Sequence, residues 1–422
     1  MLAIGLFAAA APARAQLGLP RVNLPSLPRA PAANIVTEPL QNALALQGLR
    51  ASTIRELLRD HADLLEPDPA GAPIRRSELL LLSPPRTVVD AALAQGFALL
   101  REESLPALDL TQVVLRAPAG VGTAEALARL RAIDASVDAD FNHVYTRSGE
   151  ATGASVPAPV PAMSGTPGRR VGLIDSGVDR RHAALRGAEL QAWGCDGREL
   201  PTPHGTAVAS LLVGRDRAFS GAAPGAALFA ADIYCAQPAG GAAEQVAQAL
   251  AWLVRERVAV INVSLVGPAN RVLERTVQAA IDKGHLVVAA VGNDGPAAPP
   301  LYPAAYAGVI GVTGVASSRR ALPEAAQGPQ VMLAAPGAEL AVARPGGGYV
   351  VGRGTSFAAP LVAGLLAETL STPDRHAAAR ALARLVDLAQ DLGTPGRDAV
   401  FGFGLVGERA RTAPERVQAA AR

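Results

Sequence analysis

From residue 171 onward, short apolar runs alternate with stretches of helical periodicity, and this alternation constrains the fold more than any other feature. Runs that are apolar on both faces are typical of strands in a parallel sheet that helices cover on both sides. The sequence therefore predicts an α/β domain with a doubly wound, mostly parallel sheet. The apolar runs are 171–174, 228–234, 258–263, 286–291, 309–312 and 331–334, and the helical stretches are 205–213, 243–256 and 271–283.

A different alternation occupies residues 73–147. Strand-like runs and helical patterns follow one another there in the order β-α-β-β-α-β, which is typical of a ferredoxin-like unit. We therefore expect a small α+β domain ahead of the larger sheet. Its expected strands are 77–83, 98–102, 112–116 and 140–146, and its expected helices are 87–97 and 123–136.

The remaining segments have simpler patterns. Residues 1–15 hold an apolar stretch and an Ala-Arg-Ala site, which together are typical of a secretory signal peptide, although no Lys or Arg precedes the apolar stretch. Residues 16–34 and 148–169 are rich in Pro and small residues, so we expect linkers there. Apolar spacing predicts a helical segment within 35–72. We therefore expect a secreted or periplasmic protein without a membrane span.

Charge and cysteine content exclude several classes of function. The chain has 39 basic and 37 acidic residues, and its basic residues are scattered singly, so we expect no nucleic-acid partner. Two cysteines cannot complete a four-ligand zinc site, and no H-E-x-x-H pair is present. We therefore expect no metal and no cofactor. We also expect a monomer.

Four polar residues stand where a parallel sheet places functional groups, at the carboxyl ends of strands or the starts of helices. Asp175 ends the run VGLID, and His204 opens a helix in PHGT. Asn293 follows LVVAAV, and Ser356 begins an apolar helix in GRGTSFAAP. Each alone is explained by a turn or a helix cap. Together they supply a nucleophile, a base, a carboxylate that orients the base, and an oxyanion donor.

These segments resemble the motifs of the subtilisin-like serine peptidases, or subtilases, in the order Asp, His, Ser. VGLIDSGVD, PHGTAVASLLVG, VVAAVGNDG and GRGTSFAAPLVAG correspond to the family's Asp, His, oxyanion and Ser segments. The resemblance implies a domain over 170–412 that cleaves polypeptide substrates with a triad of Asp175, His204 and Ser356. It also implies that Asn293 binds the oxyanion. INVSLVGP resembles the family's substrate-binding strand, which assigns Ser264, Leu265, Val266 and Gly267 to substrate binding.

By the same resemblance, residues 73–147 are similar to the family's inhibitory propeptide, a folding template removed by self-cleavage. The resemblance implies that this domain is an intramolecular partner and inhibitor of the peptidase. We expect the cleavage to fall within 148–169.

Five positions depart from the family pattern. Ala207 replaces a second His, and Phe357 replaces the common Met after the nucleophile. Ala184 stands where the family's strongest calcium site has an Asp, so we expect that site to be missing. Val266 and Leu301 stand where the specificity pocket has Gly, which predicts a pocket for small residues.

The two cysteines flank one β-α unit. Cys195 precedes His204, and Cys235 ends the strand after that helix. We predict one disulfide between them, and two buried free thiols are the alternative.

Two other functions stay open. An α/β-hydrolase esterase would combine Ser356 with Asp374 and His376, but its nucleophile elbow requires G-x-S-x-G and the chain reads GTSFA. A subtilase-like scaffold that binds peptides without cleaving them is the second alternative, and peptidase activity distinguishes it from the enzyme.

Overall fold

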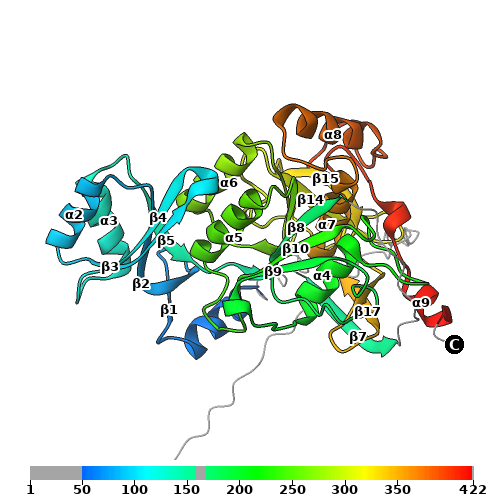
Figure 1. Cartoon of the computed structure of the whole chain (residues 1–422), viewed down its shortest axis with the longest axis horizontal. Helices are drawn as coiled ribbons and strands as arrows, with labels where there is room; N and C mark the ends of the chain where they lie inside the picture. The colour runs from blue at the N-terminus through cyan, green and yellow to red at the C-terminus, as the bar shows by residue number, and fades with distance from the viewer. Residues whose placement is uncertain (1–49, 148, 157–167, 421–422) are drawn as a thin grey trace, which may run out of the picture.

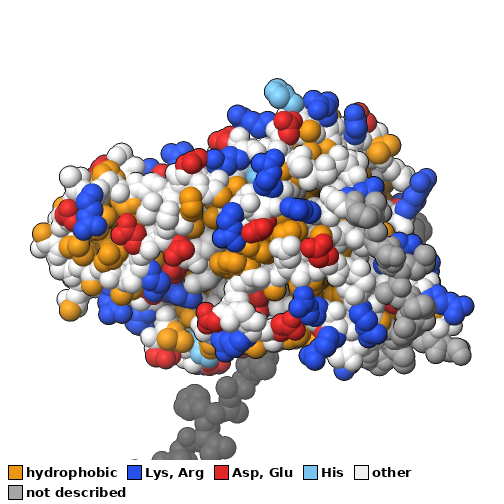
Figure 2. Space-filling model, in the orientation of Figure 1, with side chains coloured by type: hydrophobic (Ala, Val, Ile, Leu, Met, Phe, Trp, Pro, Cys, Tyr) orange, Lys and Arg blue, Asp and Glu red, His pale blue; other side chains and the backbone are white. Residues whose placement is uncertain are grey.

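The computed structural model describes residues 50–147, 149–156 and 168–420. A small N-terminal domain lies beside a larger domain built on a parallel sheet (Figure 1). On the face in Figure 2, basic and acidic side chains are interspersed, as the sequence suggests. The predicted signal peptide, 1–15, and the linker 16–34 lie outside the described residues.

The N-terminal domain has the predicted ferredoxin-like topology. Its antiparallel sheet has the order β5-β2-β4-β3, and the helices α2 and α3 pack on one face. Leu79 and Leu81 point to that helical face, whereas Leu80 and Leu82 point to the larger domain, because neighbouring residues of a strand alternate. The elements are β2 (Pro73–Leu82), α2 (Arg86–Ala94), β3 (Ala98–Leu105), β4 (Leu110–Arg116), α3 (Thr123–Ile133) and β5 (Asp138–His143).

The expectation that 35–72 is helical is only partly met. In the described part, residues 50–60 are helical, but Leu65–Pro67 forms strand β1 and pairs with β2. Leu65 is fully buried against Val144 and Ala242, so burial beside the sheet prevails over the helical spacing of the sequence.

The larger domain confirms the predicted parallel sheet. Its seven strands follow the order β15-β14-β13-β11-β8-β10-β9, and every neighbouring pair is parallel. Strand β9 (Leu190–Trp193) lies at one edge and was not predicted, because its residues are not consistently buried and form no apolar run. The other strands are β8 (Arg170–Asp175), β10 (Ala227–Asp232), β11 (Val260–Val263), β13 (Leu286–Ala290), β14 (Ile310–Val315) and β15 (Val331–Pro336).

Helices cover both faces of this sheet. Residues of α4 and α7 share one apolar cluster, and residues of α5 and α6 share another. Leu173 and Ile174, adjacent in β8, belong to different clusters, so the strand is buried on both sides. The helices are α4 (Pro203–Val213), α5 (Ala243–Arg255), α6 (Arg271–Asp282), α7 (Thr355–Ala367), α8 (Arg375–Asp387) and α9 (Pro414–Ala420).

The expected linker 148–169 contains a strand. Residues Glu150–Val156 form β7, which pairs with β17 (Tyr349–Arg353), and β17 forms a hairpin with β16 (Leu340–Ala343). Backbone pairing to an open edge needs no apolar run, which is why composition did not indicate this strand. Residues 157–167 lie outside the described part of the chain.

The sheet of the N-terminal domain docks on α5 and α6 of the larger domain. The Asn142 side chain accepts a hydrogen bond from the backbone N–H of Glu244, in the first turn of α5, at 3.2 Å. Asp140 accepts one from the N–H of Arg271, the first residue of α6, at 2.7 Å. Side chains of one domain thus cap two helices of the other, which satisfies N–H groups that helix starts leave unpaired.

Candidate active site

Two sheet-domain elements bring a carboxylate and an imidazole together. Asp175 ends β8 and is completely buried, while His204 lies in the first turn of α4 and is 7% exposed. The His204 Nδ1 atom lies 2.9 Å from the Asp175 carboxylate, which also accepts hydrogen bonds from Ser176. Because a carboxylate only accepts, Nδ1 carries a proton, and in the neutral imidazole Nε2 is then the acceptor. Nε2 has no hydrogen-bond partner among the described residues.

Ser356 lies in the first turn of α7, directly after Gly354 and Thr355. Gly354 has a φ of 133°, which favours glycine and lets the chain turn sharply into the helix. The Ser356 hydroxyl donates to the Ser264 carbonyl at 3.3 Å, so in this structure it is directed toward the strand edge. Rotation of the Ser356 side chain about χ1 would turn its hydroxyl away from the Ser264 carbonyl. Phe357 is fully buried, with its ring centroid 5.6 Å from that of His204.

Asn293 follows β13 and is held by the start of α7. Its Oδ1 accepts a hydrogen bond from the Thr355 N–H at 3.0 Å. The Thr355 hydroxyl in turn accepts one from the Gly292 N–H at 3.2 Å. A Cβ on Gly354 would lie 3.0 Å from the Asn293 Nδ2 and 2.8 Å from the Gly149 Cα. The amide donors of Asn293 therefore lie on the side where the chain passes at Gly149.

The chain that leaves the N-terminal domain runs through this site, a feature that the sequence analysis missed. Strand β6 (Thr146–Arg147) pairs antiparallel with β12 (Leu265–Val266). On its other side, the Tyr145 N–H donates to the Gly241 carbonyl at 2.8 Å. A Cβ on Gly149 would lie 3.4 Å from the Ser356 Cβ. The predicted substrate strand thus already pairs with a segment of the same molecule.

Residues of the predicted substrate-binding set lie next to Tyr145, Gly292 and Ser356. Tyr145 is fully buried, its hydroxyl donates to the Pro268 carbonyl at 2.8 Å, and a Cβ on Gly267 would overlap its ring. A Cβ on Gly292 would lie 2.6 Å from the Leu301 Cδ1, which places the Leu301 side chain next to the residue that precedes Asn293. The Ser264 hydroxyl donates a hydrogen bond to the Ser356 carbonyl, and the Ser356 hydroxyl donates one to the Ser264 carbonyl.

The two cysteines form a disulfide whose Cα atoms are 5.0 Å apart. Among the described residues, Cys195, Asp232 and Cys235 are the group whose atoms are spaced for a metal ion, but the two sulfur atoms are bonded to each other. Burial raises the pKa of the Asp232 carboxyl. Ala184, at the expected calcium position, is buried in the apolar core.

The residues of the esterase alternative lie elsewhere. Asp374 caps α8 by accepting from the Ala377 N–H at 2.7 Å, and both Asp374 and His376 are exposed to solvent. The structure therefore gives no support to a triad that includes them.

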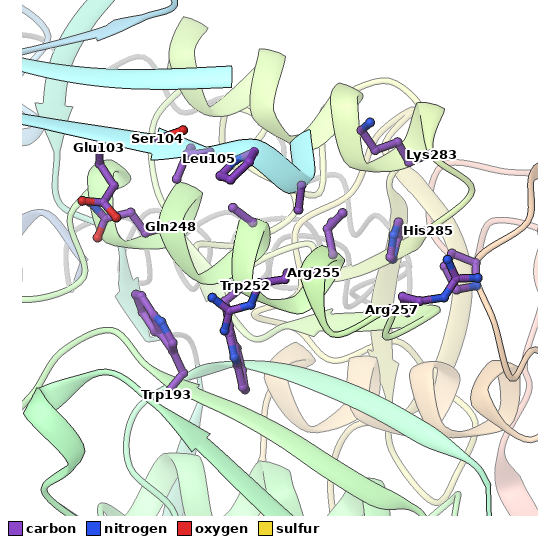
Figure 3. Close-up of a pocket in the computed structure, with 15 residues that line it drawn as sticks. Glu103, Ser104, Leu105, Trp193, Gln248, Trp252, Arg255, Arg257, Lys283 and His285 are labelled. Carbon is purple, nitrogen blue, oxygen red and sulfur yellow. The ribbon is translucent and has the colours of Figure 1, made fainter. Parts of the chain in front are cut away.

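A cavity of about 600 Å³ lies between β3, the short 3-10 helix η1 (Pro106–Leu108) and α5 (Figure 3). Trp193 and Trp252 stack on each other there, with ring centroids 6.3 Å apart. The His285 Nδ1–H donates a hydrogen bond to the Val258 carbonyl at 2.7 Å, and burial lowers the pKa of the His285 imidazole. None of the predicted triad residues lines this cavity, which is a gap between the two domains.

A carboxylate at a strand end with an imidazole and a hydroxyl at two helix starts, on a parallel sheet, defines a serine peptidase of the subtilisin type. The model of the Subtilase family matches residues 166–404, and the chain belongs to this family. It is therefore a serine peptidase that acts on polypeptides. Among the described residues, no helix is long and apolar enough to cross a membrane.

Known proteins resemble the chain over this domain. Subtilisin E of Bacillus subtilis (strain 168) is 30% identical over 279 residues, which cover 64% of the chain and 72% of the relative. A subtilisin of Bacillus pumilus is 31% identical over 250 residues, 57% of the chain and 90% of the relative. The structure of fervidolysin from Fervidobacterium pennivorans, a keratinolytic enzyme related to subtilisin, matches with a TM-score of 0.64 at 20% identity. That match covers 80% of the chain and 61% of fervidolysin, and it supports the fold alone.

Proposed function

We propose that the chain is an exported serine endopeptidase that is made as a precursor and cuts itself free of its N-terminal domain. The Ser356 hydroxyl attacks the peptide carbonyl and forms a C–O bond, while its proton passes to His204 Nε2. The amine leaves with that proton, and water then hydrolyses the acyl-enzyme by the same route. Asp175 keeps Nδ1 protonated throughout.

Two donors are assigned to the oxyanion of the tetrahedral intermediate. They are the backbone N–H of Ser356, at the positive end of α7, and the Nδ2 of Asn293. The amide is already oriented because its Oδ1 is bonded to the Thr355 N–H. Fixed donors of this kind need no reorganisation when the negative charge develops.

The observation that carries the self-cleavage proposal is the path of the chain through the site. Thr146 and Arg147 pair with β12, and Gly149 lies beside Ser356. The two peptide bonds of residue 148 are therefore the candidates for self-cleavage. The N-terminal domain caps α5 and α6, so we infer that it stays bound after the cut and inhibits the enzyme.

The test compares the full chain with Ser356→Ala and with a control, Ser318→Ala, whose residue is exposed. We expect the parent and the control to be cut next to residue 148 and Ser356→Ala to remain whole. Mass spectrometry of purified protein and N-terminal sequencing measure this. Cleavage of purified Ser356→Ala would contradict the proposal, and an uncut, inactive parent would favour the scaffold that binds without cleaving.

Export has its own test. If residues 1–15 are a signal peptide, the exported, uncut Ser356→Ala chain starts at residue 16. N-terminal sequencing of the extracellular or periplasmic fraction measures this, and a chain that stays in the cytoplasm with Met1 intact would contradict export.

A further inference from the structure

Residues 50–60 form a helix that does not belong to the ferredoxin-like unit. It is the dark blue helix below β1 in Figure 1. Leu57 and Leu58 pack on a small apolar cluster of Leu65, Val144 and Ala242. Two of these three residues lie in the N-terminal domain and one in the larger domain, so the helix is anchored where the two domains meet.

The same helix forms a wall of the cleft that contains the candidate active site. A cavity of about 180 Å³ is bounded on one side by helix residues, among them Arg50, Ile54 and Leu57. Its other side includes Gly149 and Asn293. The helix therefore lies over the segment that passes Ser356, on the side of the predicted oxyanion donor.

An ion pair connects the start of this helix to the active-site loop. The Arg50 Nε lies 3.1 Å from the carboxylate of Asp294, the residue after Asn293, and the two side chains are 19% and 15% exposed. Burial raises the pKa of the Asp294 carboxyl, and the charge of Arg50 acts against this rise. Arg50 thus offsets part of the cost of burying this carboxylate, and without Arg50 the docked helix would leave the carboxylate buried and unpaired by that arginine.

We propose that residues 50–60 are an autoinhibitory clasp that closes the active-site cleft over Thr146, Arg147 and Gly149 and delays the departure of the N-terminal domain after self-cleavage. This inference rests on the proposed function, since the clasp regulates the same site. Its contacts to Asp294 lie outside the sheet of the N-terminal domain, so the clasp adds to the inhibition by that sheet. The cleft opens only after both the clasp and the sheet of the N-terminal domain have left it.

The test uses the full chain with Arg50→Glu, which places two carboxylates opposite each other. The matched control is Arg55→Glu, which makes the same charge change at an exposed position of the same helix. All variants yield the same enzyme if self-cleavage removes residues up to 148, so the final peptidase activity serves as an internal standard. We expect Arg50→Glu to shorten the lag between self-cleavage and peptidase activity by about fivefold, the scale of one partly buried ion pair, and Arg55→Glu to leave it unchanged.

Labelling by a fluorophosphonate, which reacts with an accessible active-site serine, provides a second measurement that does not require self-cleavage. We expect Ser356 of the Arg50→Glu chain to be labelled several times faster than Ser356 of the parent and of Arg55→Glu. Equal labelling rates and equal lags in all three would overturn the clasp. An uncut parent whose labelling is still accelerated by Arg50→Glu would support the clasp and contradict self-cleavage, so the two proposals fail separately.

Discussion

At the scale of single residues, Asn293 has the most sharply defined geometry. Its Oδ1 is bonded to the Thr355 N–H, and its amide donors lie beside Gly149. We predict that Asn293→Ala lowers kcat by about 10²–10³-fold and leaves KM nearly unchanged, the effect typical of losing one oxyanion donor. Steady-state kinetics on a peptide substrate measures this, with circular dichroism as the control for folding. An unchanged kcat would show that other groups bind the oxyanion.

We infer that the Leu301 side chain limits which residue the enzyme accepts before the scissile bond. This side chain lies against Gly292, the residue that precedes Asn293. We predict a preference for Ala, Ser, Gly or Val over Phe, Tyr or Leu before the scissile bond. We also predict that Leu301→Gly raises kcat/KM for a Phe substrate by about 10–100-fold relative to Ala, because forcing a large group into filled space typically costs about 1–3 kcal/mol.

The comparison uses paired peptides that differ only in the residue before the scissile bond. Val266→Gly is the matched variant at the second position that departs from the family pattern. Faster cleavage after Phe than after Ala by the parent enzyme would show that Leu301 does not fill the pocket.

The residues that the sequence could not indicate are those whose role depends on distant contacts. Asp175, His204, Asn293 and Ser356 each end or begin an element, so a motif and a parallel sheet suffice to bring them together. Tyr145 has no such signal. Its role depends on Gly241 and Pro268, about a hundred residues further along the chain, which no local pattern reports.

At the scale of elements, burial decides what could be predicted. The central strands were predictable because both faces are buried, and each reads as an apolar run. Strands β7 and β9 were not, since β7 pairs with the hairpin β16–β17 through its backbone and β9 is a partly exposed edge strand. Strand β1 has a different cause, because Leu65 is buried beside the sheet and this burial prevails over the helical spacing of the sequence.

The disulfide links two elements near the predicted triad. Cys195 lies in the loop that leads to α4, and Cys235 follows β10, with a sequence separation of 40 residues. Closing a loop of that length stabilises by about 3–4 kcal/mol in the chain-entropy model. We predict this loss of unfolding free energy for Cys195→Ser with Cys235→Ser.

Denaturant unfolding in the Ser356→Ala background measures the loss without self-digestion. The parent unfolded in the presence of dithiothreitol is the control and should match the double variant. Alkylation of two thiols in the unreduced parent would show that the cysteines are free.

At the scale of the whole molecule, a carboxylate of the larger domain is buried where the two domains meet and pairs with arginines of the N-terminal domain. Arg101 of β3 donates to both carboxylate oxygens of Glu244 in α5, at 2.6 and 2.8 Å, and Glu244 is only 2% exposed. Arg75 lies 3.8 Å from the same carboxylate. A carboxylate buried by docking needs these partners, so the two arginines favour the docked N-terminal domain.

We predict that Arg101→Ala accelerates release of the cleaved N-terminal domain by about tenfold. Loss of one partner from a fully buried pair typically costs about 3–5 kcal/mol. The effect here is smaller because Arg101 is 41% exposed, so solvent screens the pair, and Arg75 still faces Glu244. The appearance of peptidase activity after self-cleavage measures the release.

Arg129→Ala is the matched control, because Arg129 pairs with Glu125 on the exposed surface of α3 within the same domain. Equal release rates for Arg101→Ala and Arg129→Ala would show that Glu244 does not hold the domains together, and the helix caps from Asn142 and Asp140 would then be the contacts to test next.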